Sequence, residues 1–208
     1  MAISNYTELQ AFIGQWAHRS DLVSVIPDLI KLAESHLNRV VRTKAQDKVT
    51  DLVCDTGSRF VAFPSRMVEF CDLSMVIDGY QRQIQQVGTE VFYASITENQ
   101  GTPSAYSVRD QIEFNCIPSE PYVIKCHYIQ ALDIAADSTN TVLTNYPDAY
   151  LYSTMAMVEK YTKGDPAFYL GLMNEVVRTI NSAEARSKSS TLVTELGGES
   201  RFDIYRGY

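Results

Sequence analysis

Three histidines are the side chains in this sequence that could most readily act as a general base or a metal ligand. His18 follows Trp16 near the end of an expected helix, His36 lies within a second expected helix, and His127 lies in the middle of an expected strand. None of them has the neighbours of a His-Glu-x-x-His motif or of a paired Cys/His site. The sequence therefore predicts no metal site and no catalytic residue, and each histidine should be replaceable without loss of function.

The cysteines and the paired acidic residues give equally little support to an enzyme. There is no C-x-x-C pair, which zinc sites usually need, so we expect buried free thiols in strands and a reducing compartment. The four cysteines are Cys54, Cys71, Cys116 and Cys126. Glu113 and Glu120 are expected to be solvated or to protect strand edges. No nucleophile elbow and no phosphate-binding glycine loop occurs in the sequence, so we predict a protein that is not an enzyme and needs no cofactor.

The composition is that of a globular chain that is acidic overall. Its 208 residues are 45% hydrophobic and 11% aromatic, and its formal net charge is −7. That charge counts against tight binding to nucleic acid, because such affinity comes from Lys and Arg neutralising phosphates. Residues 1–6 do not resemble a signal peptide, and no apolar stretch reaches the roughly 18 residues of a membrane span.

Helical patterns dominate both ends of the sequence. We expect a first helix capped by Thr7 with Gln10 in a capping box, and a second helix from Pro27 to about Arg42. In the second helix, Glu34 is assigned to the polar face. After a polar loop at 133–140, residues 143–163 are predicted to form one helix that is apolar nearly all round, followed by a last amphipathic helix that begins at Pro166.

The middle of the sequence has the patterns of strands. Alternating apolar and polar residues, broken by glycine and proline, predict a set of short strands with an Asp78-Gly79 hairpin turn. The expected strands are residues 49–54, 59–63, 73–77, 81–84, 106–108, 111–114 and 122–128. A short helix is expected at 89–97. An antiparallel sheet inserted between helices follows from this order.

These elements predict an α+β fold that is mainly helical. Its parts are a four-helix bundle body formed by residues 1–43 and 141–188, an inserted antiparallel β-rich domain at 44–132, and an extended C-terminal arm at 189–208. Because a helix that is apolar on all sides leaves surplus apolar surface on so small a body, the sequence also favours association between copies.

The C-terminal arm is expected to bind a partner. The last helix is predicted to stop near residues 186–190, and the arm that follows cannot build a core of its own, yet it is rich in aromatic and branched aliphatic residues. These residues are Leu192, Val193, Leu196, Phe202, Ile204, Tyr205 and Tyr208. An arm that folds back over its own domain is the alternative.

Several stretches resemble the head-to-tail adaptor (connector) proteins of tailed bacteriophages, which join the portal to the tail. The resemblance lies in the order and spacing of five stretches that together span most of residues 6–162. They are YTELQAFIGQW at 6–16, IPDLIKLAESHLNR at 26–39, FPSRMVEF at 63–70, GTPSAY at 101–106 and LTNYPDAYLY at 143–152. One departure is Ser153-Thr154-Met155, where the family has small Gly or Ala residues, and this affects the expected closeness of helix packing.

The resemblance implies a structural virion protein of the neck between capsid and tail, made in the host cytoplasm. It implies a homo-oligomeric ring, most often of twelve copies, whose C-terminal arms dock on the portal protein and to which tail or nozzle proteins attach. It also implies that double-stranded DNA passes through the lumen without specific binding and that no membrane is involved. The apolar arm residues above are then the expected portal contacts.

Other functions stay open at the level of sequence. Another neck or tail-tube component would share many of these features. A ligand- or carbohydrate-binding module would use the aromatic residues of the β-rich domain, namely Phe60, Phe63, Tyr80 and Tyr106. An enzyme would need a deep cleft that holds His127 beside a carboxylate.

Overall fold

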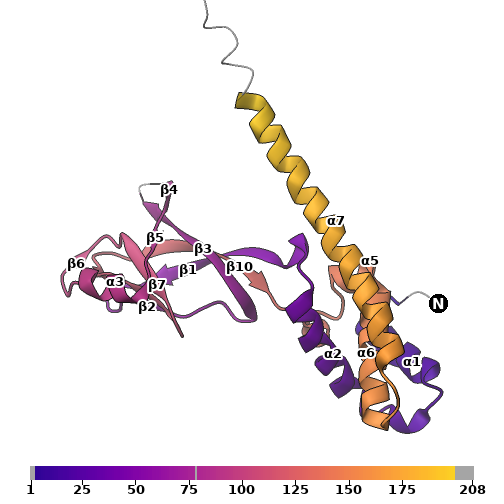
Figure 1. Cartoon of the computed structure of the whole chain (residues 1–208). Helices are drawn as coiled ribbons and strands as arrows, with labels where there is room; N and C mark the ends of the chain where they lie inside the picture. The colour runs from indigo at the N-terminus through magenta and orange to yellow at the C-terminus, as the bar shows by residue number, and fades with distance from the viewer. Residues whose placement is uncertain (1–2, 78, 200–208) are drawn as a thin grey trace, which may run out of the picture. The chain divides into compact units, whose positions relative to one another are not determined.

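The structure of the protein is a computed structural model that describes residues 3–77 and 79–199, with side chains as far as Arg186. The chain forms two compact units. The first, here called the helical unit, comprises Met1–Ala45 and Leu132–Tyr208, and the second, the β unit, comprises Gln46–Ala131. Figure 1 labels the elements of both units.

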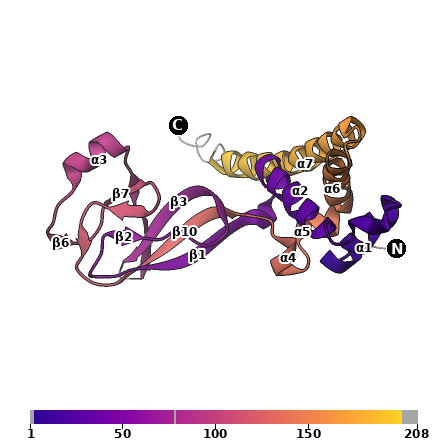
Figure 2. The ribbon, with the colours of Figure 1, turned by 90° about the horizontal axis from the view of Figure 1, so that it is seen from below.

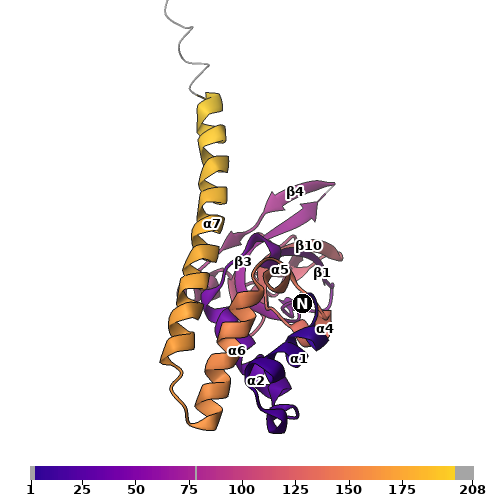
Figure 3. The same cartoon turned by 90° about the vertical axis from the view of Figure 1, so that its right-hand side faces the viewer.

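The helical unit contains six of the described α-helices. They are α1 (Tyr6–Trp16), α2 (Ile26–Val40), α4 (Ile134–Asp137), α5 (Thr141–Asn145), α6 (Pro147–Thr162) and α7 (Ala167–Glu199), with short 3-10 turns η1 (Ser20–Leu22) and η2 (Lys44–Gln46). Helix α6 packs against both α2 and α7, and Figure 3 shows α6 and α7 side by side, joined by a short connection. Fully buried residues of this core include Leu9, Ile13, Ile30, Leu37, Tyr150 and Ile180.

The helix ends follow local chemistry, with one correction to the expected caps. Helix α1 is capped by Asn5, whose side chain accepts a hydrogen bond from the backbone N–H of Glu8 at 3.0 Å. The expected capping box of Thr7 and Gln10 is therefore wrong, because Asn5 already occupies the cap position with extended backbone. Helix α2 begins at Ile26 with Pro27 in its first turn and ends at Val40, which confirms the predicted helix.

The single helix predicted at 143–163 is two helices. Helix α5 ends at Asn145 and α6 begins at Pro147, with Tyr146 between them in a non-helical conformation. Proline has no backbone N–H and disfavours helical backbone in the residue before it, so the chain breaks at this point. The predicted loop at 133–140 is also partly wrong, because Asp133 accepts from the N–H of Ala136 at 3.0 Å and caps α4.

Helix α7 is longer than the sequence pattern suggested. Asp165 accepts from the N–H of Ala167 at 2.9 Å, as expected of its cap, but the helix continues to Glu199. The expected stop near 186–190, and an extended arm from 189, are therefore wrong as far as Glu199. Residues 187–199 contain no proline, and an established helix adds Ser, Thr and Val at a cost of only a few tenths of a kcal/mol each, while Gly197 and Gly198 near its end cost about 1 kcal/mol each.

The described residues of the β unit form ten strands and helix α3 (Thr89–Ser95). The strands are β1 (Asp47–Cys54), β2 (Phe60–Val61), β3 (Met67–Ile77), β4 (Tyr80–Gln83), β5 (Gln85–Gln86), β6 (Gln100–Gly101), β7 (Ala105–Val108), β8 (Ile112–Phe114), β9 (Ile117–Pro118) and β10 (Tyr122–Gln130). One sheet has the order β1-β10-β3-β4 and is antiparallel throughout, and its long strands lie side by side in Figure 2. A second sheet has the order β2-β8-β7-β5, and β6 pairs with β9.

The fold class is α+β, but the expectation of a mainly helical protein is wrong. The described part of the β unit is built from strands with one short helix, and its core is formed by residues from both four-stranded sheets. The predicted strands and the short helix at 89–97 all overlap observed elements. The β insertion is not wholly antiparallel, since β5 pairs parallel with β7 and β6 parallel with β9. Strands β5, β6 and β9 have only two residues each, which is too short to leave a periodic pattern in the sequence.

Candidate interaction surfaces

The C-terminal part of α7 is the candidate site that the sequence pointed to. Asn181 Nδ2 donates to the carbonyl of Val40 at 2.9 Å, and Glu184 accepts from the N–H of Lys44 at 3.2 Å, so this stretch of α7 is anchored beside the end of α2. From Glu184 to Glu199 the helix runs 15 more residues, or roughly 22 Å at about 1.5 Å per residue. Figure 1 shows α7 extending well past α5 and α6.

The expected portal-binding residues fall on both sides of the described boundary. Leu192, Val193 and Leu196 belong to the helical backbone of α7. Their spacing of i, i+1 and i+4 is that of one stripe along a helix. Phe202, Ile204, Tyr205 and Tyr208 lie outside the described residues.

Helices α1, α6 and α7 also present exposed aromatic residues. Trp16 is 45% exposed, and its indole N–H donates to the hydroxyl of Tyr169 at 3.2 Å. Phe168 packs edge-on against Tyr169 with ring centroids 5.3 Å apart, and Tyr161 at the end of α6 is exposed as well. Trp16, Phe168 and Tyr169 thus form an aromatic cluster contributed by α1 and α7, of the kind that is enriched at protein interfaces, and Tyr161 is a separate exposed aromatic residue.

A groove lies beside α1 in the helical unit. It has a volume of about 830 Å³ and is lined by residues of α1, the following turn and the start of α2, among them Gln10, Gly14, His18, Val23 and Ile26. The histidine is thus a groove-lining residue, held at a φ of 51°. It has no described metal ligand or catalytic partner beside it.

Tyr150 is the centre of a buried polar network in the helical unit. Its hydroxyl donates to Glu34 Oε1 at 2.7 Å and accepts from Asn140 Nδ2 at 2.7 Å, while Glu34 Oε1 also accepts from the N–H of Ile134 at 2.8 Å. Burial first, and the Glu34 carboxylate second, raise the pKa of Tyr150 far above its ordinary value, so the hydroxyl remains a donor. The network ties α2, α4, α5 and α6 together.

The polar assignment of Glu34 was wrong, since it is only 6% exposed. Its spacing from Ile30 and Leu37 places it on the apolar stripe, and this signal could have identified it from the sequence. Ser153 and Thr154, where the sequence departs from the family pattern, are both fully buried, and Thr154 Oγ1 has no hydrogen-bond partner among the described residues. Ser153 Oγ donates to the carbonyl of Ala149 at 2.5 Å, so its hydroxyl is satisfied within α6.

His127 lies between two carboxylates, which the sequence did not reveal. Its Nδ1 is 3.1 Å from Asp72 Oδ2 on β3, and its Nε2 contacts Asp47 Oδ1 on β1. The hydrogen bond to Asp72, followed by that to Asp47, raises the pKa of His127 above its ordinary value, although partial burial opposes this. Both ring nitrogens are engaged and the side chain is partly exposed on an open sheet, so this is not the cleft that an enzyme would need.

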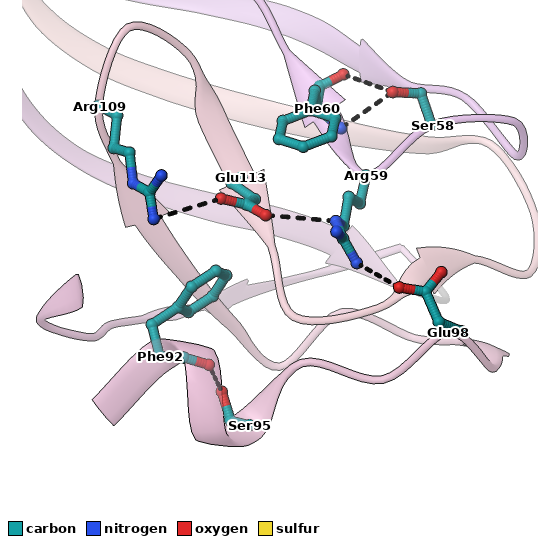
Figure 4. Close-up of polar contacts among 8 residues, drawn as sticks. All are labelled: Ser58, Arg59, Phe60, Phe92, Ser95, Glu98, Arg109 and Glu113. Carbon is teal, nitrogen blue, oxygen red and sulfur yellow. Dashed lines mark hydrogen bonds and ion pairs between the residues drawn. The ribbon is translucent and has the colours of Figure 1, made fainter. Parts of the chain in front are cut away.

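Glu113 is buried between two arginines, as Figure 4 shows. Arg59 Nε is 3.2 Å and Arg109 Nη2 is 4.0 Å from its two carboxylate oxygens, and Arg59 also binds Glu98 at 3.1 Å. The expectation of a solvated Glu113 is wrong, because it is 5% exposed and the two guanidinium groups compensate its charge. Glu120 is exposed, as expected.

All four cysteines are free thiols. Cys54, Cys116 and Cys126 are buried, and Cys71 on β3 is only partly buried. Burial raises the pKa of Cys54 to about 12 and that of Cys126 to about 11, so these thiols are poor nucleophiles.

The aromatic residues proposed for a ligand-binding module do not act together. Tyr106 is 2% exposed and lies in the core, where it packs edge-on against Phe70 and at a tilt against Phe114, so it is not available to a ligand. Phe63 packs on Phe70 with ring centroids 6.0 Å apart. The exposed members of the set are Phe60 and Tyr80.

Two further observations concern the part of the chain that the structure describes. Within it, His, Cys, Asp and Glu side chains form no group of three or more that could hold a metal ion. Within the same residues, no helix combines the length and apolar character needed to cross a membrane.

Comparison with known proteins gives one family. Residues 4–195 match the sequence model of a family described as SU10 adaptor protein. The match covers α1 to most of α7 and includes the whole β unit. No protein of curated function has a significantly similar sequence.

Proposed function

Because the chain belongs to the SU10 adaptor protein family, a family of structural proteins of the phage virion, we propose that it forms a ring that docks on the portal. In this role the ring attaches the tail or nozzle proteins on its other side and lets double-stranded DNA pass through its lumen. The resemblance seen in the sequence is thus confirmed at the level of the family. The ring, the docking and the passage of DNA are the proposal.

The observation that carries the proposal is the reach of α7. Helix α7 continues about 22 Å past its anchor at Glu184, and the apolar residues Leu192, Val193 and Leu196 belong to this stretch. We assign Leu192, Val193 and Leu196 to the portal contact, together with Phe202, Ile204, Tyr205 and Tyr208. Many copies around a ring would supply avidity to contacts that are individually weak.

Ring formation is supported by the exposed aromatic residues of the helical unit. Trp16, Tyr161 and Phe168 are 45%, 56% and 68% exposed, and aromatic residues are enriched at protein interfaces. Heterologous contacts repeated around an axis close into rings when the rotation allows. We retain twelve as the expected copy number, with α1, α2, α6 and α7 as the four-helix body within residues 1–43 and 141–188.

The charge of the chain suits a conduit. A net charge of −7 gives the protein no general affinity for the DNA backbone, so a duplex in the lumen would slide without binding. The place of the protein is then the neck of the virion, after synthesis in the host cytoplasm.

The decisive test removes the distal part of α7. A chain truncated after Arg186 should keep the melting temperature of the full chain, and it should no longer bind the purified portal of the same phage in negative-stain images and mass photometry.

A sharper version compares Leu192→Asp/Leu196→Asp with the matched control Ser190→Asp/Thr194→Asp, which places the same two charges four residues apart on polar positions. Only the first pair should lose portal binding. Full portal binding by the truncated chain would overturn the docking role of α7, and a chain that stays monomeric even with the portal would overturn the ring.

A further inference from the structure

One of the two four-stranded sheets of the β unit, the one that contains β1 and β4, has two open edges. Its order is β1-β10-β3-β4, so β1 and β4 are the outer strands and no described strand pairs with their outer sides. Every residue of β4 is exposed, and Tyr80 is 73% exposed. Edge strands with unpaired backbone groups are templates for pairing with another chain.

The register shows which backbone groups of β4 face outward. Ile84 N–H donates to the carbonyl of Leu73 at 3.4 Å, so these residues form a hydrogen-bonded pair. Bonded and unbonded pairs alternate along an antiparallel ladder. The pair that contains Arg82 is therefore bonded to β3, whereas Gln81 and Gln83 direct their N–H and C=O groups toward the open edge.

The same alternation extends to the other edge. Val76, opposite Gln81, must bond toward β10, where its partner is Val123. Val123 is in turn opposite Val53 of β1, and that pair is unbonded. Val53, and with it Asp51 and Val49, then direct their backbone groups outward. On β4 the open stretch ends at Gln83, because the N–H of Gln85 donates to the carbonyl of Ser104 and β5 pairs with β7. Among the described residues, Gln81 and Gln83 on one edge and Val49, Asp51 and Val53 on the other therefore offer outward donors and acceptors.

The charges of the two edges are complementary. Strand β4 carries Arg82, with no acidic residue and no ion pair to Arg82 among the described residues. Strand β1 carries Asp47 and Asp51 against Lys48, and within the subunit Asp47 contacts His127 while Asp51 pairs with Lys125 at 3.0 Å. Two β4 strands would bring two Arg82 side chains together and two β1 strands would bring their aspartates together, which is unfavourable across a strand pair. The charges therefore favour β4 against β1.

We propose that β4 of one copy pairs antiparallel with β1 of the next copy, so that the sheet continues from subunit to subunit. Strand directions alternate from β1 through β10 and β3 to β4, and the β1 strand of a neighbour in the same orientation continues that alternation. The contact joins two different edges, as a closed ring requires. This inference rests on the proposed ring and identifies one contact within it.

The first test removes one outward N–H of β4. Any substitution of Gln81 also removes the hydrogen bond from its side-chain amide to Ser74 Oγ at 2.7 Å, so the control must lose that bond too. Gln81→Pro eliminates the donor, and proline is tolerated on an edge strand where the N–H faces solvent. Losing one ladder hydrogen bond should weaken each contact by roughly two- to tenfold, and the proline ring also hinders close approach of the neighbour. Mass photometry should show rings of wild type and of the control Gln81→Ala, which keeps the N–H, but smaller species for Gln81→Pro at the same concentration and with the same melting temperature.

A second test remains informative if Gln81→Pro fails to fold. Gln81→Cys combined with Val49→Cys, Asp51→Cys or Val53→Cys should, for the pair that matches the register, give a ladder of disulfide-linked oligomers under oxidising conditions. All of these variants carry Cys71→Ser as well, because Cys71 is a free and only partly buried thiol. In that background Gln81→Cys alone should give no species larger than a dimer. If wild type forms rings while Gln81→Pro assembles equally well and no cysteine pair gives a ladder, this contact is wrong and the ring proposal stands. If wild type forms no ring even with the portal, both proposals fail.

Discussion

Replacing Tyr150 by Phe tests whether the buried network holds the helical unit together. The hydroxyl donates to Glu34 and accepts from Asn140, both at 2.7 Å, in a site where Tyr150 itself is fully buried. Tyr150→Phe keeps the aromatic side chain and its packing but removes both hydrogen bonds of the hydroxyl. The Asn140 amide then loses an acceptor, and Glu34 keeps the donor at Ile134 N.

The expected cost can be worked from these contacts. A hydrogen bond to a carboxylate contributes about 1.5–3 kcal/mol, and a buried donor left without its acceptor adds about 1 kcal/mol or more. Tyr150→Phe should therefore lower the free energy of unfolding by about 2–4 kcal/mol. For a chain of this length that corresponds to a drop of roughly 5–15 °C in Tm. Circular dichroism at 222 nm during heating and in urea measures the change.

Tyr161→Phe is the matched control, because Tyr161 lies on the same helix but is 56% exposed. It should leave Tm within about 1–2 °C of wild type, as most surface substitutions do. The reasoning is refuted if Tyr150→Phe melts like wild type, or if the two variants lose the same stability.

Three further substitutions or reactions test the β unit. The hydrogen bond to Asp72 raises the pKa of His127 from 6.5, so protonated His127 stabilises the fold below about pH 6.5 and this stabilisation is lost as pH rises through the raised pKa. The Tm difference between wild type and His127→Gln should therefore shrink as pH rises above about 6.5. A Tm difference that stays constant with pH would contradict this role of His127. Glu113→Ala leaves Arg59 without its buried partner and should cost about 2–4 kcal/mol in urea unfolding, whereas Glu98→Ala should cost under about 0.5 kcal/mol, because the Glu98 side chain is 81% exposed. With a thiol reagent near pH 8, Cys71 should react first and Cys54 only on unfolding, since burial raises the pKa of Cys54 to about 12; equal rates would argue against this burial.

The elements that local chemistry determines were predictable from the sequence. Pro27 and Asp165 mark helix starts through the caps and first turns they form, and both helices begin within a residue or two of the predicted positions. Strands β3 and β4 pair antiparallel as the predicted hairpin requires, with Ile77 opposite Tyr80, while Asp78 of the predicted turn lies outside the described residues. These signals lie within a few residues of the structure that they specify, so one sequence is enough to read them.

The polar groups that depend on tertiary contacts were not predictable. The sequence pattern predicts that Glu113 is a solvated residue at a strand edge, whereas the fold brings Arg59 and Arg109 from separate segments to either side of it. His127 acquires Asp47 and Asp72 only through the register of β1, β10 and β3. The partner-binding residues remain predictions, because they depend on a surface that belongs to another molecule.

The length of α7 fixes an angle as well as a distance. In a continuous helix each added residue advances the chain by about 1.5 Å and turns it by about 100°. Deleting two residues between Glu184 and Glu199 would therefore turn everything beyond by about 200°, to nearly the opposite side, while shortening the reach by only about 3 Å. Removing seven residues would shorten it by about 10 Å but restore the original direction to within about 20°. Tolerance of α7 to insertions and deletions should accordingly follow the helical repeat, so that a serial length scan of this segment separates a requirement for orientation from a requirement for reach.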